Sequence, residues 1–416
     1  MSHEIGVLSL YEGFFRGGAR ILHTDVLTGL HGRGQRHRVL SIHGQVYREA
    51  TFQWMQDDPC YRKLVAAGVQ VSALRDGDAD NTVFDDTVSD NAVSDNTVFD
   101  DHELSVVEYE SAMADVMLTL KEQPLRLVNQ AGLSGPVVTC LHRSDPQNQG
   151  PALEQLRTAV AAGRIAALIC CAESARTAYR DAGIPDGLLH VIPNGVDLRR
   201  FRPDPRARAR MRRSFAIRAD APVIAFAARY DTMKNVPLFL ASAAKFLAAH
   251  PAAHVLMCGT GMTAGNPRLL DDLRDAGLAR TPGTHDPRIH LLGPREDPQV
   301  LYAAADVVAL TSAFGEAAPL CLIEGMMCGA IPVATDVGDC ASIVDGRGLL
   351  AEPDAEAVAA AWAEALARRD EFTLALLATR AAFGRRRMIS RYATLIRRTS
   401  GVGARPLPIP LLEAVA

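Results

Sequence analysis

Two cationic residues, Arg229 and Lys234, stand five positions apart directly after the short apolar run Val223 to Ala228. This run predicts a buried strand, and a helical pattern begins at Val236. Ligands of open α/β sheets bind at the carboxyl ends of the strands, so the connecting loop lies where a ligand would bind. Two cations at that place suit an anionic group such as a diphosphate. On spacing alone, a pair of ordinary surface charges explains them equally well.

A second set of chemically useful residues surrounds a predicted helix, Pro319 to Cys328. Proline suits the first helical position, which places Glu316 in the preceding loop and Glu324 more than one turn inside the helix. The free N–H groups and positive dipole end of such a helix form a site for an anion. The two carboxylates could accept hydrogen bonds from sugar hydroxyls. Two glutamates at this spacing also occur by chance, so the pair alone decides nothing.

These segments, together with others, resemble the retaining family 4 glycosyltransferases of the GT-B fold. The matching motifs are RYDTMKN around the two cations, the E-x7-E run GEAAPLCLIEGMMCG, the following IPVATDVGD and the earlier VIPNGVD. Their order and separations also match, over about residues 125 to 370. Near the start, FFRGGAR is similar to the glycine-rich donor loop that follows the first strand of the family. The region from about 48 to 124 has no counterpart that we recognise.

The resemblance implies transfer of a sugar from a nucleotide diphosphate donor, without a metal and with retention at the anomeric carbon. Arg229 and Lys234 would hold the diphosphate and stabilise the departing nucleoside diphosphate. Glu316 would contact hydroxyls of the transferred sugar or lie under its anomeric carbon, and Glu324 would bind the ribose hydroxyls. His142, at the end of a predicted strand, would position the donor sugar or the acceptor. A strand-end histidine whose hydrogen bonds are satisfied locally is the alternative.

The resemblance assigns further residues to donor binding, mainly through the main chain. Gly17 and Gly18 open the first predicted helix, where a Cβ would hinder a close approach of phosphate or acceptor. A tight turn between strand and helix is the alternative explanation for these glycines. The loop that contains Gly293 and Arg295 would frame the base. The segment that faces the sugar and the phosphates is Ala317, Ala318, Pro319 and Leu320.

The chain departs from the family pattern near the donor and acceptor surfaces. Arg20 and Ser342 stand where many relatives have glutamate, and Ala317-Ala318 replaces the Gly-Phe of many relatives. These differences leave the diphosphate chemistry intact and the identity of the sugar open. Because UDP-sugars are the commonest donors of the family, we expect a UDP-sugar as co-substrate and no other cofactor. GDP-mannose is the alternative donor.

Apolar runs rich in Val, Ile and Leu alternate with helical patterns along the chain, which is typical of βαβ units and a mainly parallel sheet. The pattern occurs twice, so we expect an α/β protein with two Rossmann-like, doubly wound domains. In the GT-B fold these domains face each other across a cleft. The expected strands are residues 5–10, 39–43, 69–74, 125–129, 137–142, 168–172, 190–192, 223–228, 254–258, 289–292, 307–310 and 331–335.

A stretch without regular structure separates the two repeats of this pattern. The segment Pro193 to Asp197 is followed by nine arginines between positions 199 and 218, and its proline and glycine interrupt any helix or strand. We therefore expect an acceptor-side domain over 1–197 and a donor-binding domain over 198–383. The remaining 384–416 would form a helix at 385–398 that returns to the first domain, followed by an irregular tail.

An acidic segment interrupts the first domain. Residues 81 to 100 form four tandem pentads, NTVFD, DTVSD, NAVSD and NTVFD, and a period of five fits neither strand nor helix. Residues 76 to 103 contain ten acidic residues and no Lys or Arg, which predicts a disordered acidic surface loop. Calcium binding and a lid over the acceptor are the alternatives. The chain has a net charge of −4, so without these ten acids the remainder carries +6.

Composition limits the classes of protein to which the chain can belong. It has 416 residues, 48% hydrophobic and 22% charged, which indicates a folded protein and excludes collagenous and disulfide-scaffold classes. The net charge argues against a partner that is nucleic acid. No apolar run approaches the roughly 18 residues of a membrane span, and the start shows no basic leader, so we expect a cytoplasmic protein. The arginine-rich segments suggest peripheral contact with the inner membrane face as a further hypothesis.

Two other functions remain compatible with these residues. A sugar-nucleotide epimerase of related fold would bind the same donor but needs acid and base groups around the sugar ring. A catalytically silent protein that binds nucleotide sugars is the second alternative. The acceptor is open as well: small molecules, lipid-linked saccharides and polysaccharide ends all fit the first domain.

Overall fold

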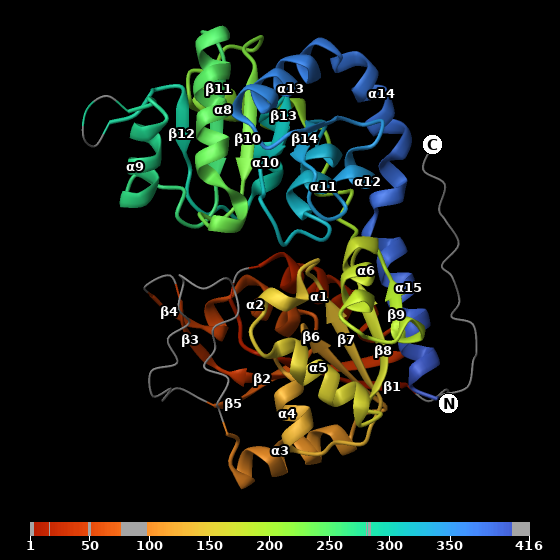
Figure 1. The fold of residues 1–416 in the computed structure, drawn as a ribbon. Helices are drawn as coiled ribbons and strands as arrows, with labels where there is room; N and C mark the ends of the chain where they lie inside the picture. Colours follow the sequence, from red (N-terminus) through yellow and green to blue (C-terminus); the bar gives the residue numbers. More distant parts are fainter. Residues whose placement is uncertain are drawn as a thin grey trace.

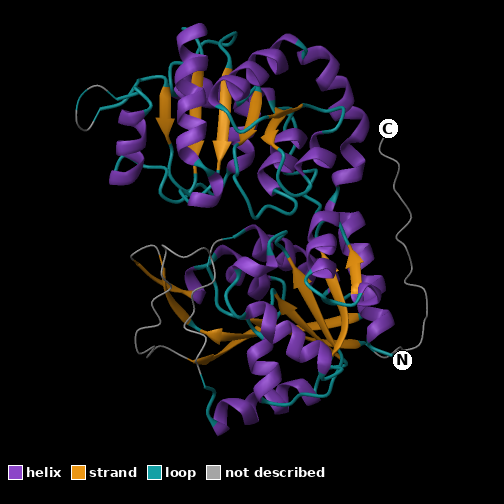
Figure 2. Ribbon diagram, viewed as in Figure 1, coloured by secondary structure: helices purple, strands orange, loops and turns teal. Residues whose placement is uncertain are grey.

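The computed structural model describes residues 4–15, 17–48, 51–75, 98–279, 281 and 284–401, and they form two α/β halves (Figure 1). The first half contains a seven-stranded parallel sheet in the order β5-β2-β1-β6-β7-β8-β9, with helices on both faces (Figure 2). Its strands are β1 (Ile5–Tyr11), β2 (Gln35–His43), β5 (Gln70–Arg75), β6 (Val116–Leu120), β7 (Val137–Leu141), β8 (Ile165–Cys170) and β9 (Leu189–Val191).

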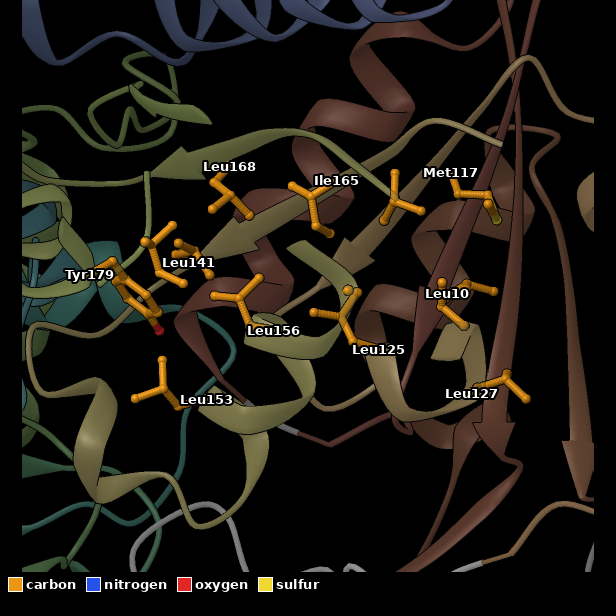
Figure 3. Close-up of a cluster of buried hydrophobic side chains, with 14 of the residues drawn as sticks. Leu10, Met117, Leu125, Leu127, Leu141, Leu153, Leu156, Ile165, Leu168 and Tyr179 are labelled. Atoms are coloured by element: carbon orange, nitrogen blue, oxygen red, sulfur yellow. The ribbon is translucent and has the colours of Figure 1, made fainter. Parts of the chain in front are cut away.

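The helices of the first half cover both faces of this sheet. Figure 3 shows one of the two resulting cores, in which Leu10, Leu141 and Tyr179 are fully buried. A separate antiparallel hairpin, β3 (Gln45–Arg48) and β4 (Thr51–Trp54), follows β2. The helices are α1 (Gly18–Leu30), α2 (Pro59–Ala66), α3 (Asp101–Ala112), α4 (Leu125–Gln130), α5 (Ala152–Ala161) and α6 (Glu173–Asp181).

The second half repeats the architecture with a six-stranded parallel sheet in the order β12-β11-β10-β13-β14-β15. Its strands are β10 (Val223–Ala227), β11 (His254–Cys258), β12 (Ile289–Leu291), β13 (Val307–Leu310), β14 (Ile331–Thr335) and β15 (Leu349–Ala351). Its helices are α7 (Pro205–Ser214), α8 (Val236–Ala249), α9 (Pro267–Asp275), α10 (Pro298–Ala304), α11 (Leu320–Met327), α12 (Cys340–Val344), α13 (Ala355–Ala367) and α14 (Arg369–Thr379).

A buried carboxylate fastens helices of the second half to its sheet. Asp306, directly before β13, is 2% exposed and accepts hydrogen bonds from Arg208 at 2.6 Å and from Arg212 at 2.8 Å. It also pairs with Arg369 and accepts a bond from the N–H of Val223 at 2.8 Å. Arginines of the segment that we considered for an anionic partner are therefore partly committed to the interior of the protein.

The last helix, α15 (Arg385–Thr399), crosses back and packs on the first half, where it appears blue in Figure 1. Its Ile389 lies against Gly29 of α1, where a Cβ would come within 2.8 Å of the isoleucine Cδ1. The two chain segments that pass between the halves run side by side. The N–H of Val196 donates to the carbonyl of Phe383 at 2.8 Å, and the N–H of Arg385 donates to the carbonyl of Val196 at 2.9 Å.

The strand expected at 125–129 is wrong, because these residues form α4. Leu125, Leu127 and Val128 are each 0% exposed and Arg126 is 2% exposed, so the first four residues of this helix are buried. Its closely spaced apolar residues resemble those of a buried strand. The true strand, β6, lies just before it, and the sequence reading missed it together with β15 and the β3–β4 hairpin.

The acidic segment differs from expectation at its carboxyl end. Residues 76–97 lie outside the described residues, but Asp100 caps α3, and its carboxylate accepts from the N–H of Glu103 at 2.8 Å. The Glu103 carboxylate in turn pairs with Arg75, and Phe99 is only 3% exposed. The disordered loop expected for 76–103 is therefore wrong from residue 98 onward, because a capping box and an ion pair order this part. No helix in the described part of the chain could cross a membrane.

Candidate functional site

A cavity of about 400 Å³ lies between the two halves, at the carboxyl ends of the strands of both sheets. Such edges are where open α/β sheets bind ligands. The first half contributes Glu12, Gly17, Gly18, Arg20, Lys121, His142, Arg143 and Asn194. The second half contributes Arg229, Lys234, Arg295, Glu316, Ala317, Ala318, Pro319 and Leu320.

An ion pair between Lys234 and Glu316 joins the two predicted motifs. The Glu316 carboxylate also accepts a hydrogen bond from the Ser312 hydroxyl at 2.7 Å. Burial opposes the charge of Lys234, but the neighbouring Glu316 outweighs it and raises the pKa of the lysine above its usual value. The lysine is therefore held charged and pointing at Glu316 inside the cavity.

The local fold of the β10–α8 connection explains where Lys234 points. Residues Thr232–Lys234 form a single 3-10 turn, in which the Asp231 carboxylate accepts from the N–H of Met233 at 2.8 Å. Asn235 follows in the left-handed region with φ 49°, and its side chain caps α8 by accepting from Leu238. Both capping residues are types that favour these positions. The turn fixes the start of the helix and therefore the position of the Lys234 main chain, from which its side chain extends.

The other two cations of the second half each have a nearby carboxylate. Arg229 approaches Asp231 at 3.3 Å, and Arg295 forms two bonds of 2.8 Å with Asp297. The loops that hold them meet tightly, because a Cβ on Gly259 would lie 2.0 Å from the carbonyl oxygen of Ala228, and its φ is 137°. Glycine is therefore required where the loops after β10 and β11 touch.

The helix after Glu316 begins one residue later than expected. Pro319 is the N-cap of α11, with φ −66° and ψ 119°, and Leu320 is the first helical residue. Proline has no N–H, so the main-chain donors of this segment belong to its neighbours. The first turn of α11 contains no acidic residue, which leaves the positive end of the helix dipole facing the cavity.

The glycines of the first half leave open space on the cavity side. Helix α1 begins at Gly18 without a side-chain cap, and a Cβ on Gly17 would meet no atom within 4 Å. A Cβ on Gly18 would come within 3.2 Å of Leu320 Cδ1, across the cavity. No described residue would clash with a Cβ at Gly17, so the close approach of phosphate or acceptor expected at this glycine stays a prediction.

His142 follows β7 and lines the cavity. Its Nε2 is buried and has no hydrogen-bond partner among the residues that the structure describes. Burial, with a smaller contribution from Lys121, lowers the pKa of His142 to about 3, so the ring is neutral at pH 7. A neutral ring with a buried nitrogen beside a cavity can donate a hydrogen bond to a ligand or accept one from it, according to its tautomer.

Two expected residues do not line the cavity. Gly293 braces a loop instead: its carbonyl accepts from Gly259 at 2.9 Å and its N–H donates to Met262 at 2.9 Å. Glu324 lies inside α11, and burial raises the pKa of its carboxyl to about 7, partly offset by Arg200. The glutamate is therefore close to half ionised at neutral pH.

The sequence reading missed an acidic residue of the first half. Glu12, directly after β1, is held by two bonds from the buried Arg126, at 2.9 and 2.7 Å. Burial would raise the pKa of Glu12, but Arg126 and His43 outweigh it and lower the pKa to about 2. Its place after the first strand could have indicated it. Lys121, with φ 67° after the missed strand β6, and Arg143 complete the charged wall.

Comparisons with known proteins match two parts of the chain to glycosyltransferase families. Residues 221–368 match the family described as Glycosyl transferases group 1, and residues 119–200 match Glycosyltransferase Family 4. A D-inositol 3-phosphate glycosyltransferase of Corynebacterium kroppenstedtii is 33% identical over 180 residues, which is 39% of this chain and 38% of that protein. The counterpart from Saccharomonospora viridis is 37% identical over 196 residues, 44% and 42% of the two chains. The chain thus spans less than half the length of these relatives.

Solved structures extend the likeness to nearly the whole chain. HepE of Anabaena, solved in complex with UDP, superposes with a TM-score of 0.75 at 19% identity and covers 95% of this chain and 100% of its own. Sucrose-phosphate synthase of Thermosynechococcus elongatus superposes with a TM-score of 0.67 at 19% identity, covering 95% and 98%. At these identities the superpositions show the two-domain fold.

Proposed function

Because the chain belongs to the family 4 glycosyltransferases of the GT-B fold, we propose that it transfers a sugar from a UDP-sugar to an acceptor hydroxyl. The observation that carries the proposal is the ion pair of Lys234 with Glu316, which lies in a cavity at the carboxyl ends of both sheets. HepE, which shares the fold, has been solved with UDP and with UDP-glucose.

The proposed reaction retains the configuration of the anomeric carbon and needs no metal. The acceptor oxygen bonds to the anomeric carbon on the face from which the phosphate oxygen leaves. The proton of the acceptor hydroxyl passes to the leaving phosphate oxygen. Arg229, Lys234 and the amino end of α11 neutralise the departing diphosphate in place of a metal ion. Glu316, fixed by Lys234, accepts hydrogen bonds from the sugar hydroxyls.

For the acceptor we propose a polyol or sugar that carries an anionic group. The curated relatives are named for inositol 3-phosphate, a phosphorylated polyol. In this chain the cavity wall of the first half combines an ionised carboxylate, Glu12, with the cations Lys121 and Arg143. The carboxylate suits acceptor hydroxyls, and the cations suit a phosphate or carboxylate group.

A thermal-shift screen with UDP, GDP, ADP and TDP sugars tests the donor. A ligand at 100 times its Kd stabilises the native state by about 2.7 kcal/mol, so a UDP-sugar is expected to raise the Tm of a chain of this length by about 3 °C. A larger shift with a GDP-sugar, or no shift with any of them, would contradict a UDP donor.

Mass spectrometry of reactions with that donor then separates the remaining alternatives. Release of UDP together with a glycosylated acceptor supports transfer, whereas an isomerised donor identifies an epimerase. A donor that binds and stays intact with every acceptor identifies a silent binding protein. The acceptor panel pairs phosphorylated polyols with their unphosphorylated forms, and equal use of both would count against an anionic acceptor.

Glu324 predicts a pH dependence of nucleotide binding. Its carboxyl has a pKa raised to about 7 in the free protein. Although Glu324 does not line the cavity of the free protein, we propose that the ribose reaches it, as the family resemblance implies, and that the ribose hydroxyls donate to its ionised form. We therefore expect UDP to bind about tenfold more weakly at pH 6 than at pH 8, because the ionised fraction falls about tenfold. Calorimetric titration of wild type and of Glu324→Gln with UDP, at pH 6 and at pH 8, measures this change in affinity. Protonation of UDP affects both proteins equally, so identical pH profiles would exclude this role of Glu324.

A further inference from the structure

We propose that Ser144, Asn194 and Asp339 are positioning residues that hold the donor loop, residues 316–319. Ser144 and Asn194 bind the loop across the two halves, and Asp339 binds it within the second half while its carboxylate binds the first. The donor site is then complete only while the halves are docked. This inference rests on the proposed function, because it concerns the loop to which we assign the sugar and phosphates. Ser144 and Asn194 belong to the first half, and Asp339 follows β14 in the second.

The three residues engage three consecutive carbonyl groups of the donor loop. The Ser144 hydroxyl donates to the carbonyl of Glu316. The N–H of Asp339 donates to the carbonyl of Ala317 at 2.8 Å. The Asn194 side-chain amide donates to the carbonyl of Ala318 at 2.9 Å. All carbonyl groups of residues 316 to 318 therefore have defined partners.

Anchored carbonyls determine where the N–H groups of the loop point. Within a trans peptide, the carbonyl of one residue and the N–H of the next point in opposite directions. The bonds to the carbonyls of Glu316 and Ala317 thus turn the N–H groups of Ala317 and Ala318 away from the anchors. Both alanines line the cavity, and the N–H of Ala318 lies against the Cys171 thiol, which also lines it. The anchors thus set the direction of both N–H groups on the cavity side of the loop.

Asp339 also connects the donor loop to a helix of the first half. Its carboxylate accepts from the N–H groups of Glu173 at 3.0 Å and Ser174 at 2.8 Å, at the start of α6. The N-cap residue of α6, Ala172, supplies no side-chain bond, so the cap comes from the opposite half. Although Asp339 stands at the N-cap of α12, its side chain forms no bond to that helix. One residue thus binds the donor loop with its N–H and the first half with its carboxylate.

These contacts couple docking of the halves to the shape of the donor loop. Separation would leave the carbonyls of Glu316 and Ala318 and the amino end of α6 without these partners. A ligand that needs the N–H groups of the loop would therefore stabilise the docked arrangement, and the docked arrangement would strengthen ligand binding by the same factor.

The test compares Asp339→Ala with Asp354→Ala. Asp354 likewise accepts from two N–H groups, at 2.9 and 3.1 Å, but it caps α13 within the second half and does not line the cavity. Loss of either cap is expected to lower Tm by about 1–2 °C. Only Asp339→Ala is expected to raise the Kd for UDP and the KM for the donor, by about tenfold.

A second pair of variants addresses the hydroxyl at 144. Ser144→Ala removes the donor to the Glu316 carbonyl and is expected to raise the same KM at least threefold, whereas Ser144→Thr keeps a hydroxyl and is expected to rescue it. Wild-type Kd and KM in both Asp339→Ala and Ser144→Ala would overturn the proposal.

Small-angle X-ray scattering of the unliganded proteins separates this inference from the proposed function. Asp339→Ala is expected to show a larger radius of gyration than wild type and Asp354→Ala. If wild type binds no nucleotide sugar, the proposed function fails, and scattering alone decides whether these residues hold the halves together. Unchanged scattering in that case would overturn the inference as well.

Discussion

Replacing Lys234 with methionine is expected to lower kcat/KM by about 10²–10³-fold, the usual cost of removing one donor to a developing negative charge. The lysine is buried in the cavity and paired with Glu316. Methionine keeps much of the side-chain volume, but it removes the charge that would stabilise the departing diphosphate. It also leaves the Glu316 carboxylate facing that diphosphate without its counter-ion. The steady-state rate of UDP release, measured over a range of donor concentrations with saturating acceptor, gives kcat/KM for the donor.

Lys245→Met is the matched control for that experiment. Lys245 lies on α8, the helix that Lys234 shortly precedes. It is 48% exposed and pairs with the exposed Glu356. Exposed ion pairs contribute little to stability because water screens them, so the control is expected to keep both activity and fold. A Lys234→Met enzyme within threefold of wild type would remove the lysine from the proposed mechanism.

The largest expected effect on stability concerns Asp306. Asp306→Ala would leave Arg208, Arg212 and Arg369 without their shared carboxylate, and Arg212 is only 3% exposed. Breaking a buried ion pair on one side costs about 3–5 kcal/mol, because the remaining charge stays buried. Urea unfolding, followed by circular dichroism, should show this loss. Asp220→Ala, which breaks the exposed pair with Arg218, is expected to leave the unfolding midpoint nearly unchanged, because water screens exposed charges.

The same carboxylate predicts how stability depends on pH. Burial would raise the pKa of Asp306, but Arg208, Arg212 and Arg369 outweigh it, and the pKa lies below its usual value. An acid with a lowered folded pKa contributes stability above its unfolded pKa, near 4, and this contribution is lost as pH falls through the folded value. The difference in unfolding free energy between wild type and Asp306→Ala should therefore shrink below about pH 4. A difference independent of pH would contradict an ionised Asp306.

The sequence predicted the residues that follow strongly apolar strands. Arg229 and Glu316 come directly or shortly after β10 and β13, whose alternation with helices is plain, so their place at the ligand edge followed from the order of elements alone. Lys121 stands in the same relation to β6, but the apolar residues of α4 nearby were taken for the strand. One wrong element thus removed one residue from the predicted site.

Other parts of the site depend on pairs that no local pattern reveals. Glu12 is held by Arg126, 114 positions later, and Ser144 reaches Glu316 across 172 positions. Neither partner belongs to a recognisable spacing, because the contact arises only when two sheets and two halves are assembled. The sequence therefore predicted the charged residues after β10 and β13 but not those after β1 and β6, and the partners that orient these charges required the structure.

The return of α15 to the first half has a consequence for how the protein is made. Met388, Tyr392 and Ile396 belong to the same buried cluster as Ile5 and Val7 of β1. The ribosome adds about 5–20 residues per second, so the strand at the start waits on the order of tens of seconds for the helix at the end. During that interval the second half can complete its own core. The half that is synthesised first is therefore the half that finishes folding last.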